Sequence, residues 1–324
     1  MVSVASAVNS FLTEHEGEGD TEGESRSQPF CHGMTEILLS VAHSPLSHRQ
    51  SLPQAARSRT EIHQSTLWDP HGAIDGAADF LRYLKQTGRR VFLVTNNSTK
   101  SVEKYLEKCT KLGLPLESSE IVCSANVTAT SLAKEGFKGP FYVIGQSGLG
   151  AELNKAGIEH FGIGISGVIV GFDSQFNYMK LMKAASYIAR GVPFYVTNED
   201  ALLPCSDYRM PGTGSIVASV RKASGAEPIV FGKPSSIVWE FIKSKYGVEA
   251  KTTLIVGDRL DTDIHLGRVS GLCTVCVMSG VTSEAVLTAA RADPAKAALL
   301  SPDLVYPSVL EMYQQLLEED KKAE

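Results

Sequence analysis

The 324-residue sequence lacks most features of secreted, membrane-spanning and nucleic-acid-binding proteins. It has only six cysteines and no apolar signal segment near its start, which favours a reducing, cytoplasmic location. No apolar run reaches the roughly 18 residues of a membrane helix, so no membrane partner is expected. A formal net charge of -5 gives no broad basic surface, so no nucleic-acid partner is expected either. Small molecules are therefore the expected partners.

Residues 1–60 differ in composition from the rest of the chain. The stretch "EHEGEGDTEGESRSQ" is acidic, rich in glycine and serine, and nearly free of aliphatic side chains. This composition predicts a disordered N-terminal segment, because too little apolar surface is available for burial. One apolar island, "MTEILLSVAH" at 34–43, interrupts it and fits either a short helix or an isolated strand.

From Trp68 onward, apolar runs alternate with amphipathic stretches, which is typical of repeated strand–helix–strand units. The pattern predicts an α/β fold with a parallel sheet covered by helices. Helices are expected at 76–88 and 101–113. Strands are expected at 91–95, 121–124, 141–145, 167–172, 194–198, 229–232, 253–257 and 274–278.

Polar residues directly follow several of these strands, at the edge where open α/β sheets bind ligands. "VFLVTNNSTK" places Thr95, Asn96 and Asn97 before a helix, where they suit a phosphate group or an elaborate helix cap. "IVFGKPSS" presents Lys233, which could neutralise a phosphoryl group or could be an ordinary surface lysine. It is not a Walker A loop, because the glycine spacing is wrong and Pro234 replaces the required Ser or Thr.

A third strand end, "TLIVGDRLDTDI", offers Asp258, Asp261 and Asp263. Carboxylates are hard oxygen ligands suited to Mg²⁺. A helix-charge role explains Asp261 or Asp263, but Asp258 precedes the turn and would be costly without a cation or partner. Metal binding is therefore favoured for Asp258. The glycines of "GQSGLG" run in the reverse of the dinucleotide-binding order, so nicotinamide binding is not expected.

Strand-TNNST, strand-GKPS and strand-GDRLDTDI resemble motifs two, three and four of the haloacid-dehalogenase (HAD) superfamily. With "LW…GAIDGA" and "PGTGS", they are most similar to its 4-nitrophenylphosphatase, phosphoglycolate phosphatase and pyridoxal phosphatase branch. The resemblance covers about 66–318. It implies a Rossmann-like parallel-sheet core at 66–137 and 227–318, interrupted by an α/β cap domain at 138–226, with homodimerisation through the cap.

The same resemblance implies a Mg²⁺-dependent phosphatase of small phosphorylated metabolites, acting through an aspartyl-phosphate intermediate. Asp258 would bind Mg²⁺, Asp263 would support the metal, Thr95 and Asn97 would hold phosphoryl oxygens, and Lys233 would offset their charge. The cap loop before "PGTGS" would select the substrate. Its candidate residues are Leu202, Leu203, Asp207, Tyr208 and Arg209.

The first HAD motif, a strand ending in DxDGVLW, is missing. Counting back from the "LW" at 67–68 places Ile62 at the nucleophile and Gln64 at the acid/base, and neither side chain can do this chemistry. "DPHG" at 69–72 is not expected to replace the motif, because it lies past the strand end and has His71 at the acid/base position. Severely impaired hydrolysis is expected, and the alternative is a non-catalytic phosphometabolite-binding or dimerising protein.

The strand before this motif is also absent from its expected place, because "PQAARSRTEIHQS" contains no apolar run. The first core strand is therefore expected to be missing or replaced. "EILLSV" at 36–41 could fill the slot, which would repair the sheet without restoring an aspartate. The abrupt switch at about residue 66 favours an altered exon or gene model over a genuine isoform or pseudoenzyme.

Overall fold

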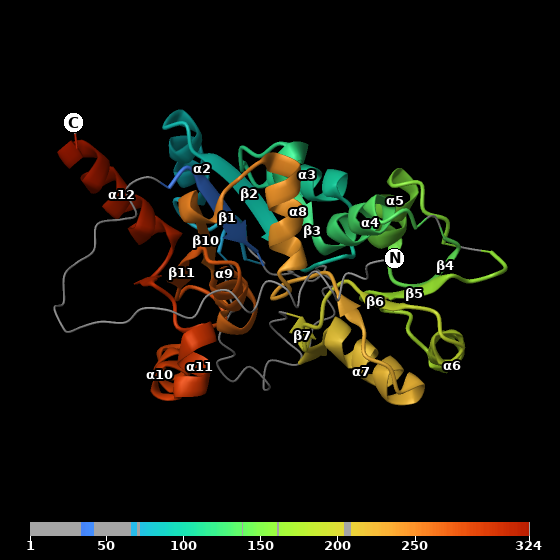
Figure 1. Ribbon diagram of the computed structural model, residues 1–324. Coiled ribbons are helices and arrows are strands. Elements are labelled where there is room, and N and C mark those ends of the chain that lie inside the picture. Colours follow the sequence, from blue (N-terminus) through green and yellow to red (C-terminus); the bar gives the residue numbers. More distant parts are fainter. Residues whose placement is uncertain are drawn as a thin grey trace, which may run out of the picture. The chain divides into compact units, whose positions relative to one another are not determined.

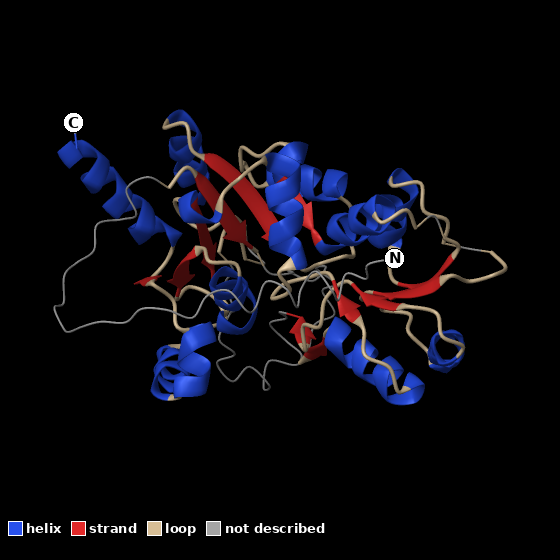
Figure 2. Cartoon of the chain, viewed as in Figure 1, coloured by secondary structure: helices blue, strands red, loops and turns tan. Residues whose placement is uncertain are grey.

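The computed structural model describes residues 34–41, 66–69, 72–137, 139–160, 162–203 and 209–323. These residues form two parallel sheets, a two-stranded ribbon and the helices that flank them (Figures 1 and 2). The predicted α/β fold with parallel sheets is confirmed. No helix in the described ranges is long and apolar enough to cross a membrane.

The larger sheet has six parallel strands in the order β12-β11-β10-β1-β2-β3. Its strands are β1 Glu36–Ser40, β2 Arg90–Thr95, β3 Ile121–Cys123, β10 Thr253–Gly257, β11 Cys273–Val277 and β12 Leu304–Tyr306. The flanking helices are α2 Ala77–Gln86, α3 Val102–Lys111, α4 Ser124–Lys134, α8 Ile237–Tyr246, α9 His265–Val269, α10 Glu284–Ala292, α11 Pro294–Leu300 and α12 Val309–Ala323. Helix α2 packs on β2 and α12, α3 packs on β3, and α9 packs on β11. With helices packed on it, the sheet buries strands that read as nearly continuous apolar runs.

Strand β1 occupies the central slot that the sequence left open. It pairs in parallel with β10 on one side and β2 on the other, and Ile37, Leu38 and Leu39 are fully buried. The first core strand is thus replaced by "EILLS", as one sequence-based alternative allowed. The apolar island that interrupts residues 1–60 forms a strand because it gains backbone partners on both edges. Disorder in the rest of this segment stays a prediction.

Truncation of a β1 side chain tests this placement. Leu38 is completely buried, so Leu38→Ala should lower the free energy of unfolding by about 2–5 kcal/mol. The matched control Leu299→Ala lies on α11, where the side chain is 39% exposed, and should change it by less than about 0.5 kcal/mol. Equal, small effects in urea titrations of both variants would contradict the central position of β1.

The smaller sheet has four parallel strands in the order β4-β5-β6-β9. They are β4 Phe141–Ile144, β5 Gly167–Val170, β6 Phe194–Val196 and β9 Ile229–Val230. Helices α6 Tyr178–Ala189 and α7 Thr213–Ser224 pack on β5 and enclose a second hydrophobic core, while α5 Ser147–Lys155 packs on α4. Strand β9 lies just past residue 226, the predicted end of the cap domain. The predicted domain boundaries stay predictions.

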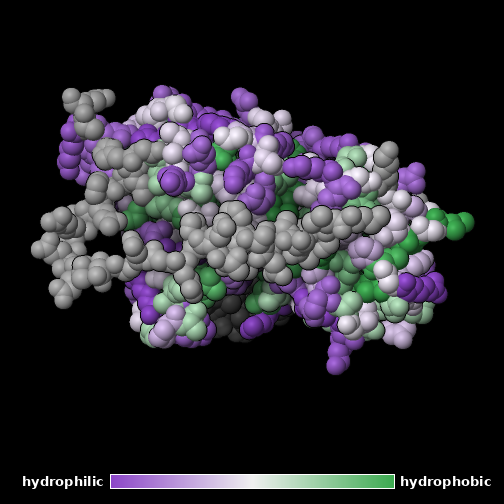
Figure 3. All heavy atoms as spheres, in the orientation of Figure 1, coloured by the Kyte–Doolittle hydropathy of each residue, from purple (hydrophilic) through white to green (hydrophobic). Residues whose placement is uncertain are grey.

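Hydrophobic side chains gather at the surface over β4, β5 and α6, at the right of the view in Figure 3. Large exposed apolar side chains of this part include Ile163, Tyr178, Met179 and Met182. Contiguous exposed apolar surface often marks a protein contact. The homodimer that the sequence predicts through the cap stays a prediction.

Candidate active site

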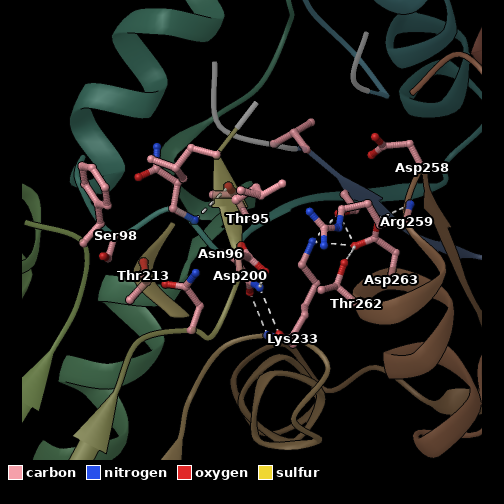
Figure 4. A pocket seen from close by; sticks show the side chains of 17 residues that line it. Thr95, Asn96, Ser98, Asp200, Thr213, Lys233, Asp258, Arg259, Thr262 and Asp263 are labelled. Carbon is pink, nitrogen blue, oxygen red and sulfur yellow. Dashed lines mark hydrogen bonds and ion pairs between the residues drawn. The ribbon is translucent and has the colours of Figure 1, made fainter. Parts of the chain in front are cut away.

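A pocket lies at the carboxyl ends of β1, β2 and β10 and is completed by residues that follow β6, by the ribbon strand β7 Leu202–Leu203 and by the start of α7. Figure 4 shows its polar side chains pointing toward one another from these separate elements. Thr95, Asn96, Asn97 and Lys233 all line it, as do Asp258 and Asp263. The strand-end residues singled out in the sequence are therefore brought together in one place.

The cradle after β2 is preorganised by its own backbone. The N–H of Asn97 donates to Thr95 Oγ1 at 3.3 Å, and Asn97 Oδ1 accepts the N–H of Thr99 at 2.8 Å. Ser101 then caps α3. Because the Asn97 side chain is committed to this turn, the hydroxyl of Thr95 is the better candidate for holding a phosphoryl oxygen.

Asn96 acts as a brace between separate parts of the chain. Its Oδ1 accepts the Lys233 N–H at 2.7 Å, and its Nδ2 donates to the Lys233 carbonyl at 3.0 Å and to Asp200 Oδ1 at 3.1 Å (Figure 4). The sequence predicted phosphate binding for Asn96. In this geometry its amide fixes the backbone at Lys233, and phosphate binding by Asn96 stays a prediction.

Lys233 forms a buried polar cluster with Asp263 and Ser40. The ammonium lies 2.8 Å from Asp263 Oδ1, with side-chain exposures of 4% and 2%, and it also donates to Ser40 Oγ and to the Val94 carbonyl at 3.5 Å. Ser40 Oγ donates to the same Asp263 oxygen at 2.7 Å. Lys233 is therefore not an ordinary surface lysine, because its charge is held inside the pocket.

The backbone after β10 delivers Asp263 to this cluster. A wide turn, η4 Leu260–Ile264, brings Asp263 back over Gly257, and a Cβ at Gly257 would lie only 2.4 Å from Asp263 Oδ2. Only glycine allows this close approach. The Arg259 N–H donates to Asp263 Oδ2 at 3.1 Å and satisfies its second oxygen.

The two buried carboxyl groups have opposite electrostatic settings. Burial, reinforced by the Asp263 charge, raises the pKa of Asp258 to about 7. Burial alone would also raise the pKa of Asp263, but the Lys233 charge and the hydrogen bonds from Lys233 and Ser40 hold it below its usual value. Asp263 is thus the carboxylate that stays ionised at neutral pH.

The pocket offers the carboxylate of Asp258 as a ligand for Mg²⁺. Asp258 is 1% exposed, and within the described ranges its carboxylate accepts the Val281 N–H at 3.1 Å but forms no ion pair. A buried carboxylate without a counter-ion suits a cation. Across the described residues, however, no three Asp, Glu, His or Cys side chains are grouped to hold a metal. Since Mg²⁺ commonly uses one or two carboxylates plus substrate phosphate and water, Asp258 fits an ion that enters with a phosphorylated ligand.

Several predicted site residues fall outside the pocket or outside the described ranges. Ile62, Gln64, Asp207 and Tyr208 lie among residues the structure does not describe. Leu202 and Leu203 line the pocket, whereas Arg209 is exposed and does not. Within "DPHG", Asp69 Oδ1 accepts the Gly72 N–H at 2.9 Å and closes a turn.

The sequence missed several pocket residues that the same strand-end rule could have found. Ser40 ends β1, and Asn198 and Asp200 follow β6. Burial raises the pKa of Asp200, which faces the pocket beside Asn96. Unlike Thr95, Lys233 and Asp258, these residues do not stand in a recognisable motif.

Together, the six-stranded parallel sheet, its phosphate-suited strand ends and the second parallel sheet inserted in its sequence define a class of Rossmann-like phosphate-handling α/β proteins. Family models described as haloacid dehalogenase-like hydrolase and HAD hydrolase-like match residues 64–159 and 230–312. The chain belongs to the haloacid dehalogenase-like hydrolases.

The relatives that the chain resembles are named phosphatases. It is 35% identical to human glycerol-3-phosphate phosphatase over 247 residues, which is 67% of this chain and 77% of the relative. It is 32% identical to the Arabidopsis thaliana chloroplastic phosphoglycolate phosphatase 1A, covering 81% of this chain and 83% of the relative. The p-nitrophenyl phosphatase structure from Archaeoglobus fulgidus matches with a TM-score of 0.74 and 27% identity, covering 87% of this chain and 98% of that one. The family assignment from the sequence motifs is confirmed.

Proposed function

We propose that this chain binds small phosphorylated metabolites in the pocket and does not turn them over as a hydrolase. Membership of a phosphatase-rich family supports the phosphate specificity. The proposed absence of hydrolysis rests on the position of Ser40, which ends the central strand beside Lys233 and Asp263. The family resemblance implies an aspartate nucleophile at the end of this strand, and a hydroxyl there cannot form an aspartyl-phosphate.

Each binding role follows from chemistry at the pocket. The Thr95 hydroxyl would donate to a phosphoryl oxygen, and Lys233 would offset the charge of the phosphoryl group. Asp258 would hold Mg²⁺ together with the bound phosphate. When bound, Mg²⁺ would neutralise part of the phosphoryl charge. Leu202 and Leu203 would contact the non-phosphate part of the ligand.

The ligand class is a small phosphomonoester. The names of two relatives specify glycerol 3-phosphate and phosphoglycolate as what those proteins act on. For this chain we propose the shared feature, one phosphate group on a short carbon chain. A cytoplasmic location and a homodimer through the cap belong to the same proposal.

Titration calorimetry with inorganic phosphate tests the binding function. The wild-type chain should bind phosphate saturably. Binding should be tighter when Mg²⁺ is present, because a phosphate oxygen can serve as a ligand of the ion. Thr95→Val should weaken binding by roughly 10- to 100-fold, the loss of one hydrogen bond to a charged group. The control Thr110→Val removes an exposed hydroxyl on α3 that bonds the Leu106 carbonyl, and should leave binding unchanged. A folded wild-type protein that gives no saturable phosphate signal would refute the proposed function.

A further inference from the structure

Ser40 has a setting unlike that of a structural serine. It is 2% exposed, lines the pocket, and donates its hydroxyl proton to Asp263 Oδ1 at 2.7 Å. Its oxygen accepts a hydrogen bond from the Lys233 ammonium. A hydroxyl with a carboxylate at its proton and a cation at its oxygen has the arrangement that activates a nucleophile.

We propose that Ser40 is a phosphoryl acceptor, which the protein uses to take the phosphoryl group from a bound phosphomonoester. This inference rests on the proposed function, because the donor must first bind in the pocket. In the transfer step, a bond forms between Ser40 Oγ and phosphorus, and the bond from phosphorus to the leaving oxygen breaks. The hydroxyl proton passes to Asp263. An aryl donor leaves as phenolate and takes its electron pair with it, so it needs no acid.

The charged side chains around Ser40 favour attack of its oxygen on phosphorus. Lys233 contacts both Ser40 and Asp263, so its ammonium stays close to the charge that develops on the attacking oxygen. The hydroxyl of Thr95 lies in the same pocket and would contact the transferred group. The acceptor, its base and the stabilising cation are therefore all contributed by this chain.

The chemistry of the product explains why transfer would stop after one turnover. An aspartyl-phosphate is a mixed anhydride that water attacks readily, whereas a phosphoserine is an ordinary phosphate ester. Replacing the nucleophilic carboxylate with a hydroxyl thus changes a transient intermediate into a persistent modification. The phosphorylated chain would also have its own pocket filled, and it would no longer bind free phosphate.

A purely structural reading of Ser40 is a hydrogen bond that stabilises the Lys233–Asp263 pair. Both readings predict that Ser40→Ala lowers stability, so stability cannot separate them. Only the acceptor reading predicts a covalent phosphoryl group on the chain. The decisive measurement is therefore the mass of the protein and the location of the modification.

The experiment is incubation of the full wild-type chain with 4-nitrophenyl phosphate and Mg²⁺, followed by intact-protein and peptide mass spectrometry. We expect one phosphoryl group per chain, on the peptide containing Ser40, and a release of 4-nitrophenolate that matches the protein concentration and then ceases. Ser40→Ala should remove both signals. The control Ser186→Ala, which alters a hydrogen-bonded serine on α6, should retain them.

Three results would overturn the inference, and the phosphate titration separates them from failure of the proposed function. An unmodified chain that still binds phosphate refutes the acceptor role alone. A phosphoryl group mapped elsewhere, or steady turnover without modification, also refutes it. Should Ser40→Ala fail to fold, peptide mapping of the wild-type chain still decides the question.

Discussion

Placing aspartate at the end of β1 should convert this chain into a working phosphatase. Ser40→Asp supplies a nucleophilic carboxylate beside Lys233, and Ala42→Asp supplies an acid/base at the DxD spacing. Ala42 itself lies outside the described residues. Because loss of a nucleophile costs about 10⁴- to 10⁶-fold, the double variant should hydrolyse 4-nitrophenyl phosphate at least roughly 10³-fold faster than the wild-type chain.

This activity should depend strictly on Mg²⁺. A carboxylate at position 40 would join the buried carboxyl groups of Asp258 and Asp263, and buried like charges repel unless a cation lies between them. Chelation should therefore abolish hydrolysis and lower the stability of the double variant. The control Ser40→Asn with Ala42→Asn is isosteric with the double aspartate variant but adds no charge, and it should not hydrolyse 4-nitrophenyl phosphate.

A second double variant separates the structural and the sequence-based positions of the nucleophile. Counting back from the "LW" at 67–68 places the nucleophile at Ile62, whereas β1 brings Ser40 to Lys233. Ile62→Asp with Gln64→Asp should stay inactive. Activity in that variant, combined with silence in the β1 variant, would show that residues 36–40 do not supply the catalytic strand.

The fold after residue 66 could be predicted because buried parallel strands appear in the sequence as apolar runs followed by polar residues. Each expected strand from 91 to 278 has a counterpart in the two sheets. Strand β12, Leu304–Tyr306, was not among the expected strands. Strand β1 was weighed only as a rescue, because its acidic, glycine-rich surroundings predicted disorder and family order placed the strand directly before Leu67.

The sequence could predict only those site residues that directly follow a strand. Thr95, Lys233, Asp258 and Asp263 follow strands and lie in one pocket, as expected from the geometry of parallel sheets. The brace from Asn96 to Lys233 joins residues 137 positions apart, and no local pattern encodes it. With β1 in place, the missing strand no longer supports an altered exon or gene model, and the missing aspartates become the remaining argument for it.

Removing the ammonium of Lys233 should be among the most destabilising single changes in the core. Lys233→Met leaves Asp263 as a buried carboxylate without its counter-ion, hydrogen-bonded by the Ser40 and Thr262 hydroxyls and the Arg259 N–H. Breaking a buried pair in this way costs about 3–5 kcal/mol. Equilibrium unfolding in urea should show this loss, while the control Lys243→Met, at an exposed position on α8, should stay within about 0.5 kcal/mol of the wild-type chain.

A double-mutant cycle and the pH dependence identify the cause of that loss. Lys233→Met with Asp263→Leu should be more stable than Lys233→Met alone, because no unpaired charge remains buried. Despite burial, Lys233 and its hydrogen bonds hold the pKa of Asp263 below its ordinary value, so the stabilisation is complete above that value and disappears as the pH falls through the lowered pKa. The gap between wild type and Lys233→Met should therefore narrow in acid. Strict additivity in the cycle, or a gap that persists in acid, would mean that lost packing and not the ion pair accounts for the effect.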